Sequence, residues 1–399
     1  MTNSSELAGE IVGQGFEAFL QYPVSIYIHL PWCLKKCPYC DFNSHATPQS
    51  DFPQHAYTDR LIDDLKYSAP LLLNREVQSI FIGGGTPSLF SPDSIDRVLS
   101  ACREFSALSP DCEITLETNP GTFEANKFAE FLACGINRLS IGVQSFHDHY
   151  LERLGRIHSA KESLQAIETA ASQGFDNINI DLMFGLPGQS LDDALEEVTM
   201  ACQQPVNHIS YYQLTLEPNT VFYRYPPALP DADQSWKIHI GAMHRLQQSG
   251  FNRYEVSAFS KPGHECQHNL NYWQYGDYLG IGAGAHSKLT NTRHIIRQQR
   301  PRQPESYMQA VNQGEQIIHR HEINTNETVF EFMLNHLRLV SGFTRDRFEI
   351  STGLDWATVA SSVDAAIDNG LMKHRDPHFR ASELGYRFLD QLTERFLPE

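Results

Sequence analysis

Three cysteines stand close together in a short segment near the amino terminus. Cys33, Cys37 and Cys40 follow a C-x3-C-x2-C spacing in PWCLKKCPYCDF, just after an apolar run. Three thiolates on one loop can converge on one metal centre. A structural zinc ion normally takes four ligands, and His29 or His45 could supply the fourth. Three cysteines without a fourth nearby favour instead a four-iron cluster that has one iron left open to chelate a substrate.

Further glycine and polar residues stand at or near the ends of the apolar runs that follow. Gly83, Gly84 and Gly85 remove side chains, so that backbone can approach a bound ligand. The remaining candidates can hydrogen-bond an amino group, ribose hydroxyls or a carboxylate: Glu117, Gln144, Arg156 and Asp181. Taken singly, each of them could instead be a polar residue whose hydrogen bonds are made within the sheet. Their placement after successive apolar runs favours one shared site.

The elements that must position these residues alternate along the first two thirds of the chain. Short β-branched runs predict buried parallel strands, and helices with a 3.6-residue period lie between them. Ser91-Pro92 and the Ser190-x-x-Asp sequence predict the starts of two of these helices. The strands are expected at 24–30, 77–83, 112–118, 138–144, 177–185 and 208–216.

Six βα units can form an open doubly wound sheet or a closed or partial barrel. An open sheet would concentrate its polar groups at one switch point, whereas a barrel places them at the carboxyl end of nearly every strand. The second pattern is present, so we predict an α/β fold with a partial (βα)6 TIM-like barrel.

The carboxyl-terminal part of the chain changes character. Residues 291–325 contain scattered arginines, prolines and glutamines and are expected to form a connector. Residues 326–399 regain a helical period and include LMKHRDPHFRAS, which could form a hairpin; this predicts a small helical, winged-helix-like domain. Residues 1–22 are expected to be an N-terminal extension and 23–290 the barrel.

Composition restricts the function classes. The chain has 399 residues, and 48 acidic against 31 basic residues give a formal charge of −17, which disfavours nucleic acid as a partner despite the winged-helix-like segment. No apolar stretch approaches a membrane span, and the amino terminus lacks the features of a signal peptide. We expect a cytoplasmic protein, with peripheral attachment to an inner membrane left open. Eight cysteines in such a chain indicate metal ligands or buried thiols rather than disulfides.

The chain resembles the coproporphyrinogen-oxidase-like branch of the radical SAM superfamily. The matching runs include IYIHLPWCLKKCPYCDF, FIGGGTPSLF, ETNPG, RLSIGVQSF, LERLGRIHS, NIDLMFGLPGQS and YLGIGAGAHS. The resemblance implies that Cys33, Cys37 and Cys40 ligate a [4Fe-4S] cluster. It also implies a set of residues that contact S-adenosylmethionine (SAM): Tyr27, Gly84, Gly85, Thr86, Glu117, Gln144, Arg156, Asp181, Gln213 and His286.

Two features choose within the branch. The oxygen-independent coproporphyrinogen III oxidases carry another cysteine two residues after the third ligand, where this chain has Phe42. The run HNLNYW matches the H-N-x-x-Y-W motif of the HemW-type haem chaperones through His268, Asn269, Tyr272 and Trp273. The resemblance implies a protein related to porphyrin biosynthesis that binds haem and delivers it to a membrane-associated respiratory haem protein. The alternative is the oxidase itself, which would make the chain an enzyme; Phe42 disfavours it.

The residues of HNLNYW allow two interpretations. If the segment is helical, His268 and Tyr272 share a face at i, i+4; the imidazole could ligate haem iron and the phenol could cover the porphyrin. A packed aromatic motif with a hydrogen-bonded histidine is the alternative. Weaker haem candidates are His319, His321 and Cys266, and Arg293, Arg297, Arg300 and Arg302 could bind propionates or be solvated residues of the connector. The sequence leaves homodimerisation open.

Overall fold

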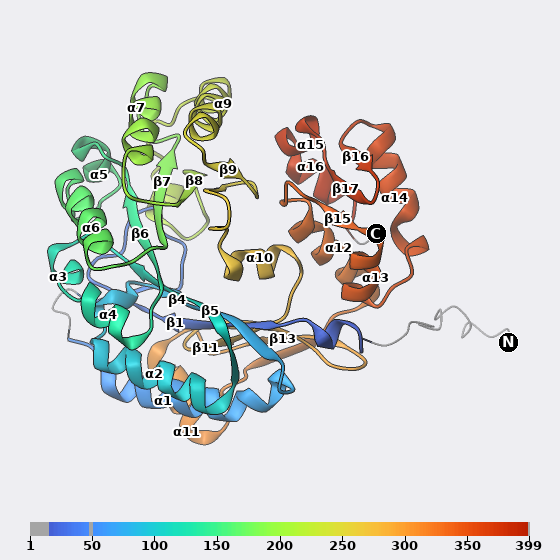
Figure 1. Ribbon diagram of the computed structural model, residues 1–399, viewed down its shortest axis with the longest axis horizontal. Helices are drawn as coiled ribbons and strands as arrows, with labels where there is room; N and C mark the ends of the chain where they lie inside the picture. The colour runs from blue at the N-terminus through green and yellow to red at the C-terminus, as the bar shows by residue number, and fades with distance from the viewer. Residues whose placement is uncertain (1–15, 48–50, 398–399) are drawn as a thin grey trace, which may run out of the picture.

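A large curved sheet with helices on its outer side forms the main body of the molecule (Figure 1). The structure is a computed structural model that describes residues 16–47 and 51–397. The expectation that the chain begins without a signal peptide falls on residues 1–15, outside the described residues. No helix in the described ranges has the length and apolar character needed to cross a membrane.

The sheet contains the six predicted parallel strands in sequence order. Neighbouring strands follow the order β14-β13-β12-β11-β1-β4-β5-β6-β7-β8-β10-β9, and this row does not close on itself. The six parallel strands are β1 (Val24–Leu30), β4 (Glu76–Gly84), β5 (Ala107–Thr118), β6 (Arg138–Gln144), β7 (Ile178–Phe184) and β8 (His208–Gln213). The expected partial barrel is therefore confirmed.

Shorter strands extend the sheet at both ends. β11 (Tyr278–Ile281) pairs parallel with β1, and antiparallel strands continue from it. The antiparallel additions are β12 (His286–Thr290), β13 (Ile295–Gln299) and β14 (His319–Glu322) at one end, and β10 (Ala258–Ser260) and β9 (Asn252–Arg253) at the other.

Helices cover the outer side of the sheet, and their starts carry the predicted caps. The Ser91 hydroxyl accepts a hydrogen bond from the Ser94 amide, and Ser190 and Asp193 form a capping box. The helices of the barrel are α1 (Gln54–Ser68), α2 (Pro92–Phe105), α3 (Thr122–Ala125), α4 (Phe128–Cys134), α5 (Asp148–Arg153), α6 (Ala160–Ser172), α7 (Leu191–Cys202), α8 (Val221–Arg224) and α9 (Ala232–Gln248). α10 (Gln267–Trp273) differs, because it packs on β1 and β4 and on helix α12 (Thr325–His336) of the C-terminal domain (Figure 1).

Side chains alternate between the two faces of each barrel strand. Outward-facing positions are apolar and pack under the helices, as Ile26, Ile80 and Leu116 do. Inward-facing positions are mostly polar, because alternate residues of a strand point to opposite faces. Residues from four strands that line the interior cavities are Glu117 in β5; Arg138, Ser140, Gly142 and Gln144 in β6; Asn179 and Asp181 in β7; and Ser210 and Tyr212 in β8. The barrel interior is thus a polar surface within an apolar shell.

Residues 291–325 differ from the expected connector. They contain β13, α11 (Pro304–Gln313) and β14, and both strands belong to the main sheet. The physical reason is a buried ion pair: Arg300, fully buried, lies 3.2 Å from the Asp64 carboxylate on α1. This buried ion pair holds the segment that contains Arg300 against α1 of the barrel. Arg300 is therefore buried and paired, and is not a solvated residue.

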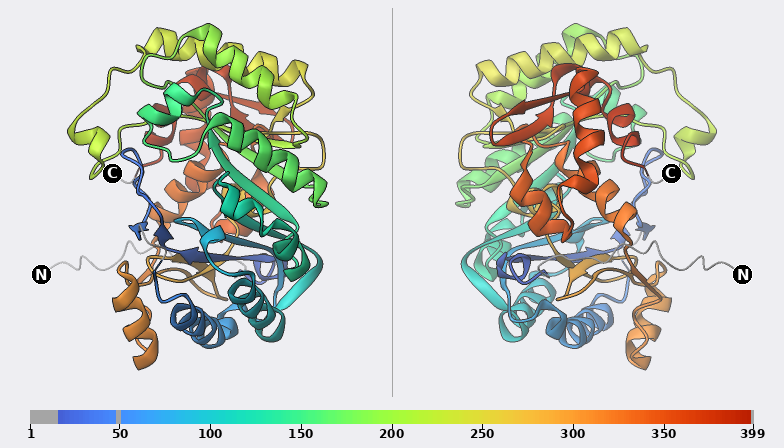
Figure 2. Two further views of the ribbon diagram at one scale, coloured as in Figure 1. Left: turned by 90° about the vertical axis from the view of Figure 1, so that its left-hand side faces the viewer. Right: turned by 90° about the vertical axis from the view of Figure 1, so that its right-hand side faces the viewer.

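The C-terminal domain has its own apolar core and matches the expected helical, winged-helix-like arrangement. It lies at the inner, open side of the curved sheet (Figure 2). Its elements are α12 (Thr325–His336), β15 (Phe343–Thr344), α13 (Arg345–Thr352), α14 (Ala357–Asp368), β16 (Met372–Arg375), β17 (His378–Ala381), α15 (Glu383–Arg387) and α16 (Leu389–Glu394). The predicted hairpin is β16 and β17.

Candidate functional site

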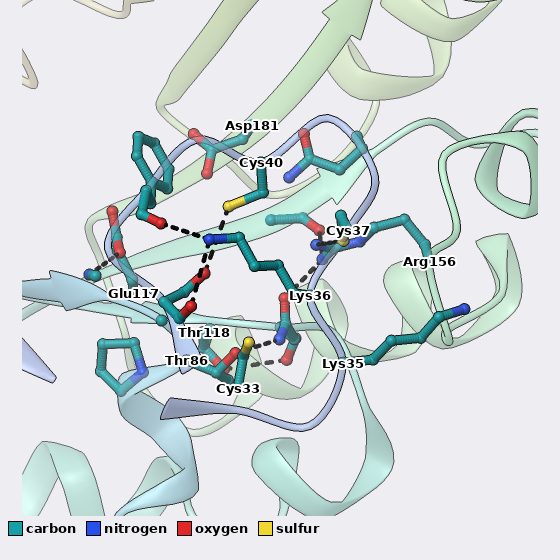
Figure 3. Close-up of a pocket in the computed structure, with 18 of the residues that line it drawn as sticks. Cys33, Lys35, Lys36, Cys37, Cys40, Thr86, Glu117, Thr118, Arg156 and Asp181 are labelled. Carbon is teal, nitrogen blue, oxygen red and sulfur yellow. Dashed lines mark hydrogen bonds between the residues drawn. The ribbon is translucent and has the colours of Figure 1, made fainter. Parts of the chain in front are cut away.

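The cysteine loop connects β1 to α1 and is folded back on itself by short-range contacts. β2 (Trp32–Cys33) pairs with β3 (His45–Ala46), and the Lys36 ammonium donates to the Phe42 carbonyl at 2.9 Å. The loop places Cys33, Cys37 and Cys40 around one cavity of about 130 Å³ (Figure 3).

The donor set around this cavity fits an iron–sulfur cluster. In the part of the chain that the structure describes, no group of three or more His, Cys, Asp or Glu side chains is arranged to hold a single metal ion. In a four-iron cluster each cysteine binds a different iron, so the thiols must surround a pocket rather than meet at a point. Of the two histidines considered as a fourth ligand, His29 has both ring nitrogens hydrogen-bonded, to the Tyr27 hydroxyl and the Asn43 carbonyl. His45 Nε2 is buried and has no partner.

Gly84 and Gly85 are required for the close packing of β4 against the cysteine loop. A Cβ atom at Gly85 would lie 2.4 Å from the Trp32 carbonyl oxygen, and one at Gly84 would lie 2.5 Å from the His29 ring. Gly84 also has a φ of +119°, which disfavours any side chain. Because Gly84 and Gly85 have no side chains, the end of β4 can pack closely against the cysteine loop. Its backbone then forms part of the wall of the cysteine cavity and can contact a ligand there.

Most of the residues expected to contact SAM lie in this cavity with the cysteines. They are Gly84, Gly85, Thr86, Glu117, Gln144, Arg156 and Asp181. Arg156 reaches the loop itself: its guanidinium lies 3.7 Å from Cys37 Sγ and 2.6 Å from Asn119 Oδ1. The structure therefore brings the three cysteines and the predicted polar residues to one cavity, from six separate loops and strands.

Two carboxylates share the inner wall of the cavity. Burial and the neighbouring Asp181 raise the pKa of Glu117 to about 7, although the Gly84 N–H donates to Glu117 Oε2 at 3.0 Å. Burial also raises the pKa of Asp181 above its usual range. A nearby positive charge would favour the ionised form of such carboxyl groups.

Gln144 is held in an unusual conformation at the end of β6. Its φ of +69° is in the left-handed region, which non-glycine residues rarely adopt, and its side-chain oxygen accepts a hydrogen bond from the Tyr212 hydroxyl at 2.7 Å. Backbone strain of this kind is concentrated at functional sites, where surrounding contacts enforce it. The conformation turns the amide toward the cysteine cavity.

A second cavity, of about 760 Å³, adjoins the first inside the barrel. Five residues line both: Phe42, Gly84, Glu117, Ser140 and Asp181. Its volume is in the range of cavities that bind organic ligands of drug or cofactor size. All four residues of the HNLNYW motif, His268, Asn269, Tyr272 and Trp273, line it.

The HNLNYW segment is helical, as one of the two interpretations requires. It forms α10, and the rings of His268 and Tyr272 contact each other edge-on with centroids 4.9 Å apart. The His268 ring is buried and stacks on Phe81 at 5.1 Å. Its Nδ1 lies 3.1 Å from the Ser79 hydroxyl, and its Nε2 is buried without a partner. Burial lowers the pKa of His268 to about 3, with a smaller effect from the positive Arg138, so the ring is neutral.

Three residues expected in the SAM site lie elsewhere. Tyr27 and His286 line the larger cavity, not the cysteine cavity. Gln213 lines neither and is exposed beside Gly185, because Tyr212 points inward and the next residue of a strand points to the opposite face.

Several polar residues of the two cavities were not selected by sequence reasoning. Asn119 and Tyr212 line the smaller cavity, and Arg138, Asn179 and Ser210 line the larger one. The sequence signal that could have identified them is the alternation of side chains along a strand. Most of these residues lie two positions from an inward-facing residue on the same strand. Of the four arginines at 293–302, Arg302 lines the larger cavity, whereas Arg297 pairs with Glu331 at 2.6 Å and Arg300 is paired with Asp64. His319 and His321 are exposed on β14 and line neither cavity.

Comparison with known proteins agrees with this architecture. Residues 27–201 match the radical SAM superfamily, and residues 323–388 match the HemN C-terminal domain. The heme chaperone HemW of Escherichia coli (strain K12) is 44% identical over 378 residues, which cover 94% of this chain and 99% of that protein. The heme chaperone HemW of Bacillus subtilis (strain 168) is 34% identical over 94% of this chain and 99% of its own length.

A solved structure shows the same fold. Coproporphyrinogen III oxidase (HemN) from Escherichia coli superposes with a TM-score of 0.80 at 22% sequence identity, covering 96% of this chain and 91% of that chain. The superfamily match implies a [4Fe-4S] cluster and SAM as cofactors, and the cysteine cavity has the donors for both. Identity to the curated relatives over nearly the whole length decides the assignment: the chain belongs to the HemW family of radical SAM proteins.

Proposed function

We propose that this protein is a haem chaperone in which haem occupies the larger cavity and His268 Nε2 ligates its iron. The curated relatives named heme chaperone HemW support the class of function. The observation that carries the proposal is His268, a residue that lines the cavity of about 760 Å³ and whose Nε2 is buried without a partner. A neutral imidazole that has one nitrogen hydrogen-bonded and the other free is the form that ligates metals.

The walls of the cavity suit a flat aromatic ligand. Phe81, Tyr27 and Tyr272 surround the His268 ring, with centroids 5.1, 6.3 and 4.9 Å from it. Aromatic side chains bury large apolar surfaces and pack well against a porphyrin plane. Trp273 completes this side and lies under the guanidinium of Arg338, which is 4.2 Å from its ring centroid.

The cluster and SAM belong to the smaller cavity in this proposal. Cys33, Cys37 and Cys40 hold the cluster, and Glu117, Gln144, Arg156 and Asp181 contact SAM. When bound, the cluster supplies one-electron chemistry at SAM; the chain's own residues orient the cofactors and exclude water. The two cavities share Glu117 and Asp181, so the occupants of the two cavities would be neighbours.

A haem titration tests this function. Cluster-reconstituted protein is titrated with haem without oxygen, and absorbance is followed for the wild type, His268→Ala and, as a matched control, the exposed His321→Ala. We expect saturable binding with a ligated-haem spectrum in the wild type and in the control, and a loss of that spectrum in His268→Ala. Absence of saturable binding in the wild type would overturn the proposal. A spectrum unchanged in His268→Ala would move the iron ligand to another residue.

Delivery is a further part of the proposal. We propose that the haem passes to a membrane-associated haem protein of the respiratory chain, which would bring the protein to the inner membrane surface. The test is transfer of haem from the loaded protein to such an acceptor stripped of its haem, with free haem at equal concentration as the control. Equal rates in the two reactions would contradict a delivery function.

Coproporphyrinogen oxidation is the second candidate. It is supported by the fold shared with coproporphyrinogen III oxidase from Escherichia coli, but at 22% identity this likeness shows the fold alone. Phe42 occupies the position of the additional cysteine and lines both cavities with a 63% exposed side chain. Formation of protoporphyrinogen by the reduced, cluster-loaded protein would establish this activity.

A further inference from the structure

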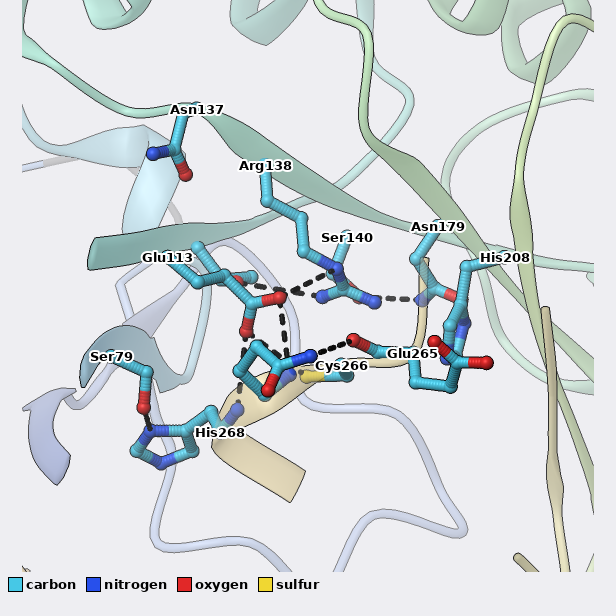
Figure 4. A network of polar contacts seen from close by, with 12 residues as sticks. Ser79, Glu113, Asn137, Arg138, Ser140, Asn179, His208, Glu265, Cys266 and His268 are labelled. Carbon is cyan, nitrogen blue, oxygen red and sulfur yellow. Dashed lines mark hydrogen bonds and ion pairs between the residues drawn. The ribbon is translucent and has the colours of Figure 1, made fainter. Parts of the chain in front are cut away.

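A buried arginine faces the larger cavity from the middle of the sheet. Arg138 begins β6, its side chain is 2% exposed, and it lines the cavity beside Ser140 and Asn179 (Figure 4). A guanidinium has five N–H donors and stays charged at any pH that proteins experience. Burying such a charge is costly unless it is paired and hydrogen-bonded.

The partners of Arg138 within the described chain do not satisfy it. Its Nε has no hydrogen-bond partner, and the nearest carboxylate oxygen, Glu113 Oε2, is 3.9 Å away. Its one hydrogen bond is a long contact of 3.5 Å from a terminal nitrogen to the Thr115 hydroxyl. These distances are at the limit of what counts as an ion pair or a hydrogen bond.

Glu113 is engaged elsewhere. Its carboxylate accepts hydrogen bonds from the backbone amides of Gln267 and His268, at 3.1 and 3.2 Å, and from the Cys266 thiol at 3.5 Å (Figure 4). These bonds hold the first turn of α10, which carries His268, against the sheet. Glu113 therefore caps α10 and lies at ion-pair distance from Arg138 without forming a hydrogen bond to it.

The other polar groups of this part of the cavity are paired with one another. Asn179 donates to Ser140 and Asp181 at 2.8 Å each, and its oxygen lies 2.6 Å from the His208 ring. The second ring nitrogen of His208 is 2.8 Å from the Tyr254 hydroxyl. Burial, and after it the positive Arg138, keep the pKa of His208 far below its usual value, so the ring adds no charge. Arg138 is thus the charged donor that remains available to a ligand.

We propose that Arg138 is an anion subsite of the larger cavity and binds a carboxylate of the ligand held there. The inference rests on the proposed function, because haem carries two propionate groups and one of them would accept the hydrogen bonds that Arg138 lacks. An arginine can hold a carboxylate with two parallel hydrogen bonds, which sets the orientation of the ligand as well as its affinity. Arg138 would thereby fix the rotation of the porphyrin about the axis through His268.

The test compares haem with its dimethyl ester, in which both propionates are uncharged. Both are titrated into the wild type, Arg138→Gln, Arg138→Lys and the control Arg302→Gln, which removes the exposed arginine of the same cavity. We expect the wild type to bind haem about 10- to 100-fold more tightly than the ester, the range for a charge-assisted hydrogen bond. The preference should fall to near one in Arg138→Gln, return in part in Arg138→Lys, and persist in Arg302→Gln.

The outcomes separate this inference from the haem function. If the wild type binds haem and ester equally, the anion subsite is wrong and haem binding stands. If the preference survives in Arg138→Gln and is lost in Arg302→Gln, the carboxylate lies near Arg302 and the inference is also wrong. If the wild type binds neither, both proposals fail. Should Arg138→Gln not fold, as judged by near-ultraviolet circular dichroism, Arg138→Lys and Arg302→Gln still decide: a preference that is unchanged in Arg138→Lys and lost in Arg302→Gln would overturn the inference.

Discussion

The Nδ1 atom of His268 lies 3.1 Å from the hydroxyl of Ser79, a residue of β4 that is separated from it by 189 positions in the chain. Ser79 in turn lies 2.7 Å from the hydroxyl of Ser25 on β1. This buried chain of hydroxyls orients the imidazole, and the opposite ring nitrogen is buried without a partner. Groups that hold the second nitrogen of a ligating histidine set both its tautomer and its orientation.

Ser79→Ala is expected to weaken haem binding about 10- to 100-fold without abolishing it, because the imidazole loses its orienting partner but keeps its free nitrogen. The measurement is the haem dissociation constant by absorbance titration. Ser25→Ala is the matched control, since it removes the neighbouring hydroxyl but leaves the contact between Ser79 and His268. A larger effect in Ser25→Ala than in Ser79→Ala would contradict the orienting role.

Replacement of any one of Cys33, Cys37 and Cys40 by serine should lower the iron and sulfide bound after reconstitution to a small fraction of the wild-type amount. The reason is that a cluster held by three thiolates loses the ligand that anchors one of its irons. Iron content and the absorbance of the cluster are the measurements. Cys202→Ser is the control, because Cys202 lies at the end of α7 outside the cysteine cavity. Full iron loading in one of the three variants would remove that cysteine from the ligand set.

Glu117 should make the stability of the protein fall as the pH rises. The folded protein holds the Glu117 proton up to about pH 7, whereas the unfolded chain releases it near pH 4.5. Between these values the folded state binds more protons, so the free energy of unfolding decreases by up to about 1.4 kcal/mol for each pH unit. The difference between wild type and Glu117→Gln isolates this contribution, because other buried acids such as Glu197 remain in both.

The Glu117 prediction is measured by urea unfolding at pH 5, 6, 7, 8 and 9. The wild type should lose stability relative to Glu117→Gln as the pH rises through this window, and the two proteins should then run parallel above it. A constant difference across the window would show that the carboxyl group titrates at its ordinary value.

The ion pair of Arg300 with Asp64 should be essential for stability. Arg300→Met leaves a buried carboxylate without its positive partner, and breaking such a pair costs about 3–5 kcal/mol. The control is Arg97→Met, because Arg97 pairs with Asp59 at the surface, where an ion pair contributes about 0–1 kcal/mol. Chemical unfolding gives both values. Equal losses in the two variants would contradict the role of Arg300 in holding residues 291–325 to the barrel.

The sequence by itself determined the parts of this protein that depend on local pattern. The short β-branched runs predicted all six parallel strands, although the inward-facing positions of these strands are mostly polar. Helix starts at Ser91 and Ser190 followed from local capping. The C-x3-C-x2-C spacing predicted three neighbouring thiols, and Cys33, Cys37 and Cys40 do line one cavity, because residues on one short loop are neighbours whatever the rest of the fold does.

Only the tertiary structure decided what depends on contacts between distant residues. The placement of Tyr27 and His286 in the larger cavity, and of Gln213 outside both, follows from strand parity and from the register between strands. Arg300 looked like a solvated residue because its partner, Asp64, is 236 positions away. Arg138 looked like an ordinary start of a strand, since the engagement of Glu113 with α10 cannot be seen in sequence. Burial and pairing of charges are properties of the assembled core, and a local pattern does not contain them.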